Sequence, residues 1–171
     1  MDFRPAISPR LVEMDGRIFQ DAAMGLREEL LSLPLEHRLS YDADKNLFFV
    51  NFEGLAVRSA QQIEAIHQAV SERLGPVGHK VLAVVNYDNF SITPELVDAY
   101  GRMVRDLVDR YYSHVTRYTA SAFLRARLGE TLGQSDVLPN LYADSQAAIS
   151  ELQDTTQPAS PPLGDAPPRV A

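Results

Sequence analysis

The residues best suited to chemistry lie in one polar run, Asn86–Thr93, directly after the apolar run Val81–Val85. A helix start follows, because Thr93 is a good N-cap and Pro94 suits the first helical position. The predicted order is therefore strand, loop and helix N-terminus, where free N–H groups and the helix dipole favour an anion. The candidate binding residues of this loop are Asn86, Tyr87, Asp88, Asn89, Ser91 and Thr93.

Ordinary turn chemistry gives the same loop a purely structural interpretation. Asparagine and aspartate form local hydrogen bonds in turns, and Tyr87 and Phe90 would anchor the loop in the core. The loop nevertheless follows the carboxyl end of a strand, where α/β sheets bind their ligands. Ser91 is not needed as the cap, and a phosphate on it would be tolerated near a helix N-terminus. Both interpretations stay open.

A second set of candidate residues lies in the arginine-rich C-terminal third. Arg117 falls on a predicted buried strand, where a guanidinium must be paired. Most of the other arginines are typical of a solvated helix face, with nearby aspartates as partners at helical spacing. The alternative is a docking surface for an acidic partner or for the phosphates of coenzyme A. The candidate contacts for an anion or a partner are Arg117, Tyr118, Ser121 and Arg125.

Other chemistries lack the residues they need. The chain has no cysteine, which excludes thiolate nucleophiles and disulfides. His37, His67, His79 and His114 show no metal-ligand spacing, so we expect no metal and no cofactor. No phosphate-binding loop, dinucleotide fingerprint or Gly-x-Ser-x-Gly is present. We find no complete catalytic constellation, so catalysis by this chain alone is not expected.

Composition narrows the class further. A chain of 171 residues with 45% hydrophobic residues can form one domain with a real core. The net charge of −7 argues against a general nucleic-acid binder. The longest apolar runs, such as Leu47–Val50, are far shorter than the roughly 20 residues that span a bilayer. Met1–Arg10 has no apolar signal region. We therefore expect a cytoplasmic protein without a membrane partner.

The elements that must position these residues follow from local patterns. Arg38–Phe52 is typical of a β-hairpin, with turn residues around Asp44. Ser59–Leu74 predicts a helix, because Ser59 and Gln62 form a capping box and Gly75-Pro76 ends it. Lys80–Val85 predicts a central strand with parallel neighbours. The remaining predictions are a helix from Thr93 to about Tyr112, a strand Val115–Thr119, a helix from Ser121 to about Leu132 with Phe123 on its apolar side, and a short helix Asp144–Leu152 capped by Asp144 or Ser145.

This order predicts an α/β fold, a small mixed sheet with helical crossovers. We divide the chain into a lead-in segment at residues 1–37, with a short helix over Asp21–Leu31, and an α/β domain at residues 38–135. A short C-terminal helix follows at residues 136–153. Residues 154–171 are rich in proline and predict a disordered tail.

Two stretches resemble a known family. Met1–Pro9 and Met14–Phe19 look like the sequence that closes the catalytic body of propionate-type acyl-CoA:acetate/3-ketoacid CoA transferases. Val85–Phe90 and Val115–Arg125 look like an extension beyond that body, and the resemblance covers residues 1–150. It implies an association with CoA transferase activity. The family's catalytic glutamate maps onto no residue here, and Glu53 before Gly54 is typical of a turn.

At the level of architecture, the element order is also similar to STAS-type domains of anti-sigma-factor antagonists and anion transporters. In that resemblance the loop Asn86–Thr93 is the regulatory loop, with Ser91 or Thr93 as the matching hydroxyl. The two hypotheses are therefore an accessory module that docks to a transferase body or self-associates, and a stand-alone STAS-like regulatory domain with a phosphorylatable or anion-binding loop. A catalytic transferase is disfavoured, since covalent catalysis needs an activated nucleophile.

Overall fold

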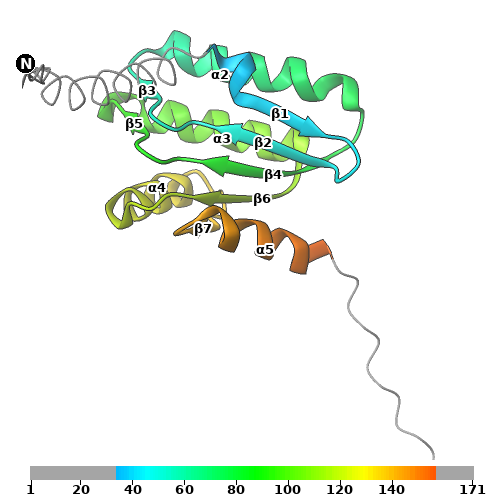
Figure 1. The fold of residues 1–171 in the computed structure, drawn as a ribbon. Coiled ribbons are helices and arrows are strands. Elements are labelled where there is room, and N and C mark those ends of the chain that lie inside the picture. The colour runs from blue at the N-terminus through cyan, green and yellow to red at the C-terminus, as the bar shows by residue number, and fades with distance from the viewer. Residues whose placement is uncertain (1–33, 157–171) are drawn as a thin grey trace, which may run out of the picture.

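The computed structural model describes residues 34–156, and their centre is one mixed sheet (Figure 1). Its strands lie in the order β1-β2-β4-β6-β7. Only β1 and β2 pair antiparallel, and the other neighbours are parallel. The predicted α/β class with a small mixed sheet is confirmed. The strands are β1 (Leu39–Asp42), β2 (Leu47–Asn51), β4 (Val81–Asn86), β6 (Tyr112–Tyr118) and β7 (Leu141–Tyr142).

Helices cover both faces of this sheet. The hydrophobic core joins the sheet to α2 (Ala60–Leu74), α3 (Val97–Tyr111) and α4 (Ala122–Gln134) on one side. On the other side α5 (Ser145–Thr156) packs on β4, β6 and β7, and buries Ala148 and Leu152 against Val84 (Figure 1). Short 3₁₀ segments complete the described chain: η2 (Leu35–Arg38), η3 (Gly75–Val77) and η4 (Pro94–Leu96). The result is a three-layer sandwich around β4.

The central position of β4 explains its sequence. It lies between parallel neighbours β2 and β6, as predicted from its continuous hydrophobicity. Val81, Ala83 and Val85 face the main core, while Val84 faces α5. Each of these buried valines contributes about 1.5–3 kcal/mol of transfer free energy. A strand burying both faces is therefore the structural centre of the domain.

The capping box predicted for α2 is present. The Ser59 side chain accepts from the backbone N–H of Gln62, and the Gln62 side chain accepts from the backbone N–H of Ser59. The predicted end is confirmed, since α2 ends at Leu74 with Gly75 as its C-cap, although Gly75 itself is helical and opens η3. Gly78, with φ of 76°, is the left-handed residue that ends the helical segment. Pro76 fits inside η3, where its fixed φ is compatible with a helical turn.

Several other elements differ from their sequence patterns. The strand predicted at Val115–Thr119 begins earlier, at Tyr112, directly after α3. Phe123, predicted on the apolar side of α4, is 74% exposed. A two-stranded parallel sheet of β3 (Ala56–Val57) and β5 (Ser91–Ile92) was not predicted, and neither was β7. Two residues are too few to show a periodicity, so these short strands left no signal.

The ends of the described chain limit two further predictions. The helix predicted at Asp21–Leu31 lies outside the described residues, as does most of the predicted tail. The C-terminal helix α5 continues to Thr156, past the predicted boundary at Asp154. Its predicted cap is present, since Asp144 Oδ1 accepts from the N–H of Ala147 at 2.9 Å.

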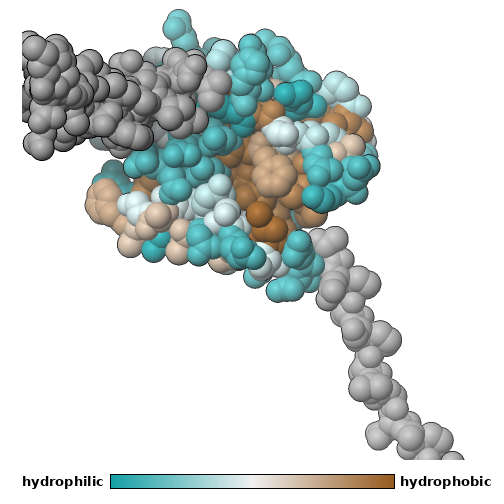
Figure 2. Space-filling view, viewed as in Figure 1, coloured by the Kyte–Doolittle hydropathy of each residue, from teal (hydrophilic) through white to brown (hydrophobic). Residues whose placement is uncertain are grey.

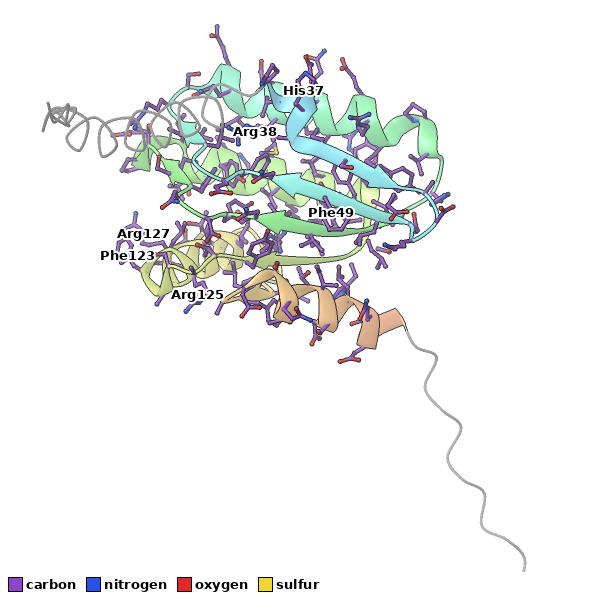
Figure 3. All side chains as sticks on the ribbon, in the orientation of Figure 1. His37, Arg38, Phe49, Phe123, Arg125 and Arg127 are labelled. Atoms are coloured by element: carbon purple, nitrogen blue, oxygen red, sulfur yellow. The ribbon has the colours of Figure 1, made fainter. Side chains whose placement is uncertain are left out.

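An apolar area remains uncovered on the α5 side of the sheet. Figure 2 shows it as a brown region over the neighbouring strands β2 and β4. Phe49, on β2, is 37% exposed and labelled on this side in Figure 3. Leu47 and Leu82 pair with each other two residues further along β2 and β4, and both are half-buried against the cluster of Val84, Ala148 and Leu152. The helix α5 therefore covers this face only in part.

Candidate functional site

The predicted loop lies at the carboxyl edge of the sheet, where β2, β4 and β6 end side by side. Three segments meet there: the turn after β2 around Glu53, the loop after β4, and the segment from Thr119 to Ser121 after β6. This is the edge at which open α/β sheets bind ligands. The structure thus places Asn86–Asn89 next to Tyr118 and Ser121, as one candidate site would require.

Asn86 is occupied within the protein. Its Nδ2 donates to Oδ1 of Asn51 at 3.3 Å and to Oε2 of Glu53 at 3.4 Å. Its Oδ1 accepts from the backbone N–H of Asp88 at 2.9 Å. These contacts use both ends of the amide. Asn86 therefore links the ends of β2 and β4 and shapes the start of the loop.

Asp88 joins all three segments. Its Oδ1 accepts from the backbone N–H of Ala120 at 2.7 Å, and its backbone carbonyl accepts from the N–H of Gly54 at 2.9 Å. The structural interpretation of this loop is therefore supported for Asn86 and Asp88, although only the bond from the Asp88 N–H to Asn86 is local and the others reach segments distant in the sequence. A charged acceptor makes the bond to Ala120 stronger than an ordinary amide bond.

Charged groups of both signs lie at this edge, because the guanidinium of Arg38 donates to the carbonyls of Asn51 and Glu53, beside the carboxylate of Glu53. Partial burial raises the pKa of Tyr118, and the carboxylates of Asp88 and Glu53 raise it further. Glu95 and Asp98 lie in the first turns of η4 and α3, where they already complement the positive helix end. An anion would meet these carboxylates. Because Arg38 lies at the same edge, the anion site stays a prediction.

The aromatic residues of the loop belong to the core. Tyr87 is 1% and Phe90 is 4% exposed, and their rings meet edge to face with centroids 5.0 Å apart. Phe52 and Tyr100 pack against the same pair. The hydroxyl of Tyr87 lies 2.7 Å from the hydroxyl of Tyr100. The prediction that Tyr87 and Phe90 anchor the loop is confirmed.

The second half of the loop differs from the predicted helix start. Ser91 lies in β5, exposed, with its N–H donating to the carbonyl of Leu55. Thr93 is at the N-cap position of η4 and Pro94 follows it, as predicted, but the Thr93 side chain makes no capping bond, because its hydroxyl donates to the carbonyl of Val57 at 3.2 Å. Asn89 is exposed and left-handed, with φ of 53°. Thr93 therefore keeps its predicted position, while its hydroxyl bonds the end of β3 instead of the helix N-terminus.

The second predicted set does not form one site. Arg117 lies in the core, 1% exposed, while Tyr118 faces the opposite side of β6. Arg125 donates through Nη1 to the carbonyls of Thr119 at 2.6 Å and Ala120 at 3.2 Å. Ser121 is the N-cap of α4 and accepts from the N–H of Leu124. Arg125 and Ser121 therefore hold the segment that connects β6 to α4.

An apolar groove adjoins Ser91 and is absent from the sequence predictions. We call it the α4 groove; its volume is about 260 Å³, and its lining includes Ser91, Ile92, Val97, Phe123, Leu124 and Arg127. The Arg127 guanidinium lies 5.9 Å from the centroid of the exposed Phe123 ring. Figure 3 shows both residues, with Arg125, on α4. The only sequence signal was an aromatic residue in the first turn of a helix, which resembles a core position.

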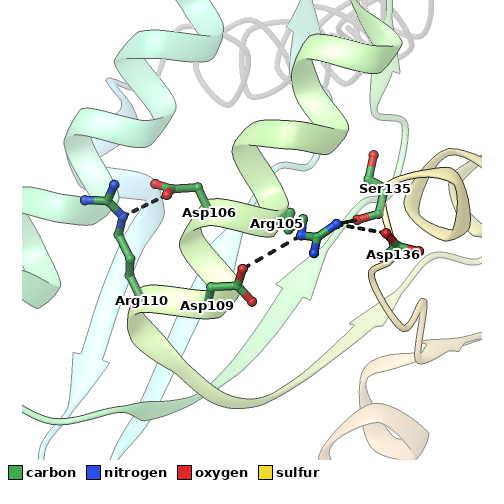
Figure 4. Close-up of polar contacts among 6 residues, drawn as sticks. All are labelled: Arg105, Asp106, Asp109, Arg110, Ser135 and Asp136. Atoms are coloured by element: carbon green, nitrogen blue, oxygen red, sulfur yellow. Dashed lines mark hydrogen bonds and ion pairs between the residues drawn. The ribbon is translucent and has the colours of Figure 1, made fainter.

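The acidic and basic residues of α3 form the pairs predicted at helical spacing. Arg110 Nε lies 2.8 Å from Asp106, and Arg105 Nε lies 3.8 Å from Asp109 (Figure 4). Arg105 also reaches Asp136, after α4, at 2.9 Å. A solvated helix face is therefore the supported interpretation for these arginines, and it leaves no free basic surface along α3 at these positions.

Within residues 34–156, no three histidine or acidic side chains gather in a way that could hold a metal ion. The helices of this same part of the chain are all too short or too polar to cross a bilayer. Comparison with protein-family models, with curated proteins and with solved structures finds no match for this chain.

Proposed function

We propose that this chain is a non-catalytic accessory module that docks to the catalytic subunit of an acyl-CoA:acetate/3-ketoacid CoA transferase in the cytoplasm. The observation that carries the proposal is the exposed Phe123 beside the α4 groove. A large aromatic side chain next to an apolar groove is the usual anchor of a protein–protein interface. The resemblance of residues 1–150 to the C-terminal extension of such transferases supplies the identity of the partner.

The polar residues at the carboxyl edge support docking rather than catalysis. Asn86, Asp88 and Arg125 are used in hydrogen bonds that hold the loops together. A general base or a nucleophile needs a free, activated group within reach of a substrate. Rigid loops beside an apolar groove instead present a fixed surface to a partner. Self-association through the same groove is the variant of this proposal that needs no second gene product.

The test is capture of the tagged chain from an extract of its own cells, with bound proteins identified by mass spectrometry. We expect a CoA transferase catalytic subunit in stoichiometric amount, and about tenfold less of it with Phe123→Ser, as loss of an aromatic anchor implies. Leu138→Ser is the matched control, since Leu138 is 75% exposed and does not line the groove. A monomeric chain that captures no transferase would refute the proposal.

A second candidate function is a stand-alone STAS-like regulatory domain, switched by phosphorylation of Ser91. Ser91 favours it, because its side chain is exposed on β5 and lines the α4 groove. A phosphate there would change the charge of a docking surface without unfolding the protein. Comparing Ser91→Ala with Ser91→Asp tests this function. Equal partner binding by both variants would count against it.

A further inference from the structure

Arg117 is a fully buried cation with no ion-pair partner among residues 34–156. Its Nη1 donates to the carbonyls of Leu138 at 3.1 Å and Pro139 at 3.0 Å. Its Nε is buried and has no hydrogen-bond partner in this part of the chain. A guanidinium stays charged in proteins, and an uncompensated buried charge is costly. The two carbonyl dipoles do not neutralise it, and neither does the uncharged Tyr87 side chain that also hydrogen-bonds the guanidinium.

The same side chain lines a small cavity between the sheet and the helices α2 and α3. The cavity has a volume of about 20 Å³, which is room for a single small occupant. Tyr87, Tyr100 and Tyr112 line it together with Arg117, and apolar residues such as Val85 form the rest of the wall. No aspartate, glutamate or histidine contributes to this lining. The polar side chains of the cavity are therefore a guanidinium and phenols.

These polar groups can donate more hydrogen bonds than they accept from one another. The hydroxyls of Tyr87 and Tyr100 lie 2.7 Å apart, and that bond uses one of their two protons. The Tyr87 side chain also hydrogen-bonds Arg117, and the Nε–H of Arg117 has no partner in this part of the chain. Burial raises the pKa of Tyr87, Tyr100 and Tyr112, so the phenols stay neutral donors rather than becoming counter-ions. What the cavity lacks is an acceptor with negative charge.

We propose that this cavity binds one dehydrated monovalent anion of chloride size, held by Arg117 and the tyrosine hydroxyls. A chloride ion would accept from Nε–H and from a phenol, and it would compensate the buried positive charge. A water molecule fits the volume but supplies no charge. Sulfate and phosphate are too large for a space of this size. The anion is a structural ligand, so the free energy of unfolding should rise with the halide concentration.

The experiment is unfolding of the full chain in mixtures of sodium chloride and sodium gluconate at constant ionic strength. We expect the folded-to-unfolded ratio to rise about tenfold when chloride reaches ten times its dissociation constant. Arg117→Gln should lose this dependence, whereas Arg110→Gln, which changes an exposed arginine of α3, should keep it. Equal chloride dependence in Arg117→Gln, or none in the wild type, would overturn the proposal.

A crystallographic measurement decides the case even if Arg117→Gln fails to fold. Wild-type crystals grown in sodium bromide should show an anomalous bromine peak beside Arg117 Nε. Density for water alone at that position, with no anomalous signal, would overturn the proposal. Tyr100→Phe provides a milder variant, because it removes one donor and keeps the ring. We expect it to weaken chloride affinity several-fold while the protein remains folded.

Discussion

Asp88 Oδ1 accepts a hydrogen bond from the backbone N–H of Ala120, so the loop after β4 is tied to the segment that leads into α4. The bond is short, at 2.7 Å, and its acceptor is charged. The backbone carbonyl of Asp88 meanwhile holds Gly54, after β2. One residue therefore fixes the relative positions of three strand ends, and this makes Asp88 the clearest target for mutation.

Replacing Asp88 with alanine should destabilise the carboxyl edge locally. We expect a loss of about 1–2 kcal/mol in the free energy of unfolding, because a charge-assisted hydrogen bond is removed. The Ala120 amide should exchange with solvent roughly tenfold faster. Asp88→Asn keeps an acceptor oxygen and should recover part of both effects. Glu130→Ala, at an exposed position of α4, is the control. Unchanged exchange at Ala120 would contradict the role assigned to Asp88.

Replacing Thr116 with valine should loosen α5. Thr116 is completely buried, and its hydroxyl donates to the carbonyl of Ala148 at 2.9 Å. Valine keeps the shape but loses the donor, so we expect a cost of about 1 kcal/mol. Faster amide exchange in α5 than in α2 would show that the effect is local. Thr131→Val, in which the lost bond lies within α4, is the control. Uniform acceleration across both helices would argue against a specific tie between β6 and α5.

Replacing Gly101 with alanine should destabilise the contact of α3 with the segment after α4. A Cβ at this position would collide with the side chain of Ser135. Alanine gains about 1 kcal/mol of helix propensity, but overpacking costs about 1–3 kcal/mol. We therefore expect a net loss in the single variant. Ser135→Gly combined with Gly101→Ala should remove the collision and leave the propensity gain. A double variant no more stable than Gly101→Ala would contradict this account.

The pair of His67 and Asp106 should make stability depend weakly on pH. The hydrogen bond from His67 lowers the pKa of Asp106 below its usual value of 3.8, and Arg110 acts in the same direction. Because the folded-state pKa is lowered, the contribution is present above the unfolded-state pKa and is lost as pH falls through the folded-state value. Both side chains are about one-third exposed, so the contribution is well below 1 kcal/mol. Wild type and Asp106→Asn should differ at pH 6 and converge near pH 2. A constant difference across this range would contradict the prediction.

The sequence predicted those features in which the interacting residues lie close together along the chain. The capping box of Ser59 and Gln62 and the cap by Asp144 depend on residues three positions apart, so the sequence contains the whole interaction. The two parallel neighbours of β4 also followed from its unbroken hydrophobicity. Thr93 shows the limit of this reasoning. Its partner, Val57, is distant in the sequence, and the β3–β5 pairing that brings them together covers too few residues to leave a pattern.

The candidate site was predictable in its location but not in its chemistry. A strand followed by Asn86–Asp88 correctly placed the loop at the carboxyl edge of the sheet. The charges around it include Glu53 and Arg38, which lie far from the loop in the sequence, and the exposure of Phe123 depends on how α4 packs. Burial of Arg117 was expected, whereas its lack of an acidic partner became visible only with the three-dimensional neighbours of β6.

The hairpin of β1 and β2 differs from the rest of the sheet in how far apart its pairing residues lie along the chain. Leu39 pairs with Val50 in the same hairpin, whereas the whole of α2 lies in the sequence between β2 and its other partner, β4. Closing a short loop costs less chain entropy than closing a long one. We therefore expect the hairpin and the capped α2 to form early, and the junctions of β4 with β2 and β6 to limit the folding rate. Under that order, substitutions at Val84 slow refolding, and substitutions in α5 mainly speed unfolding.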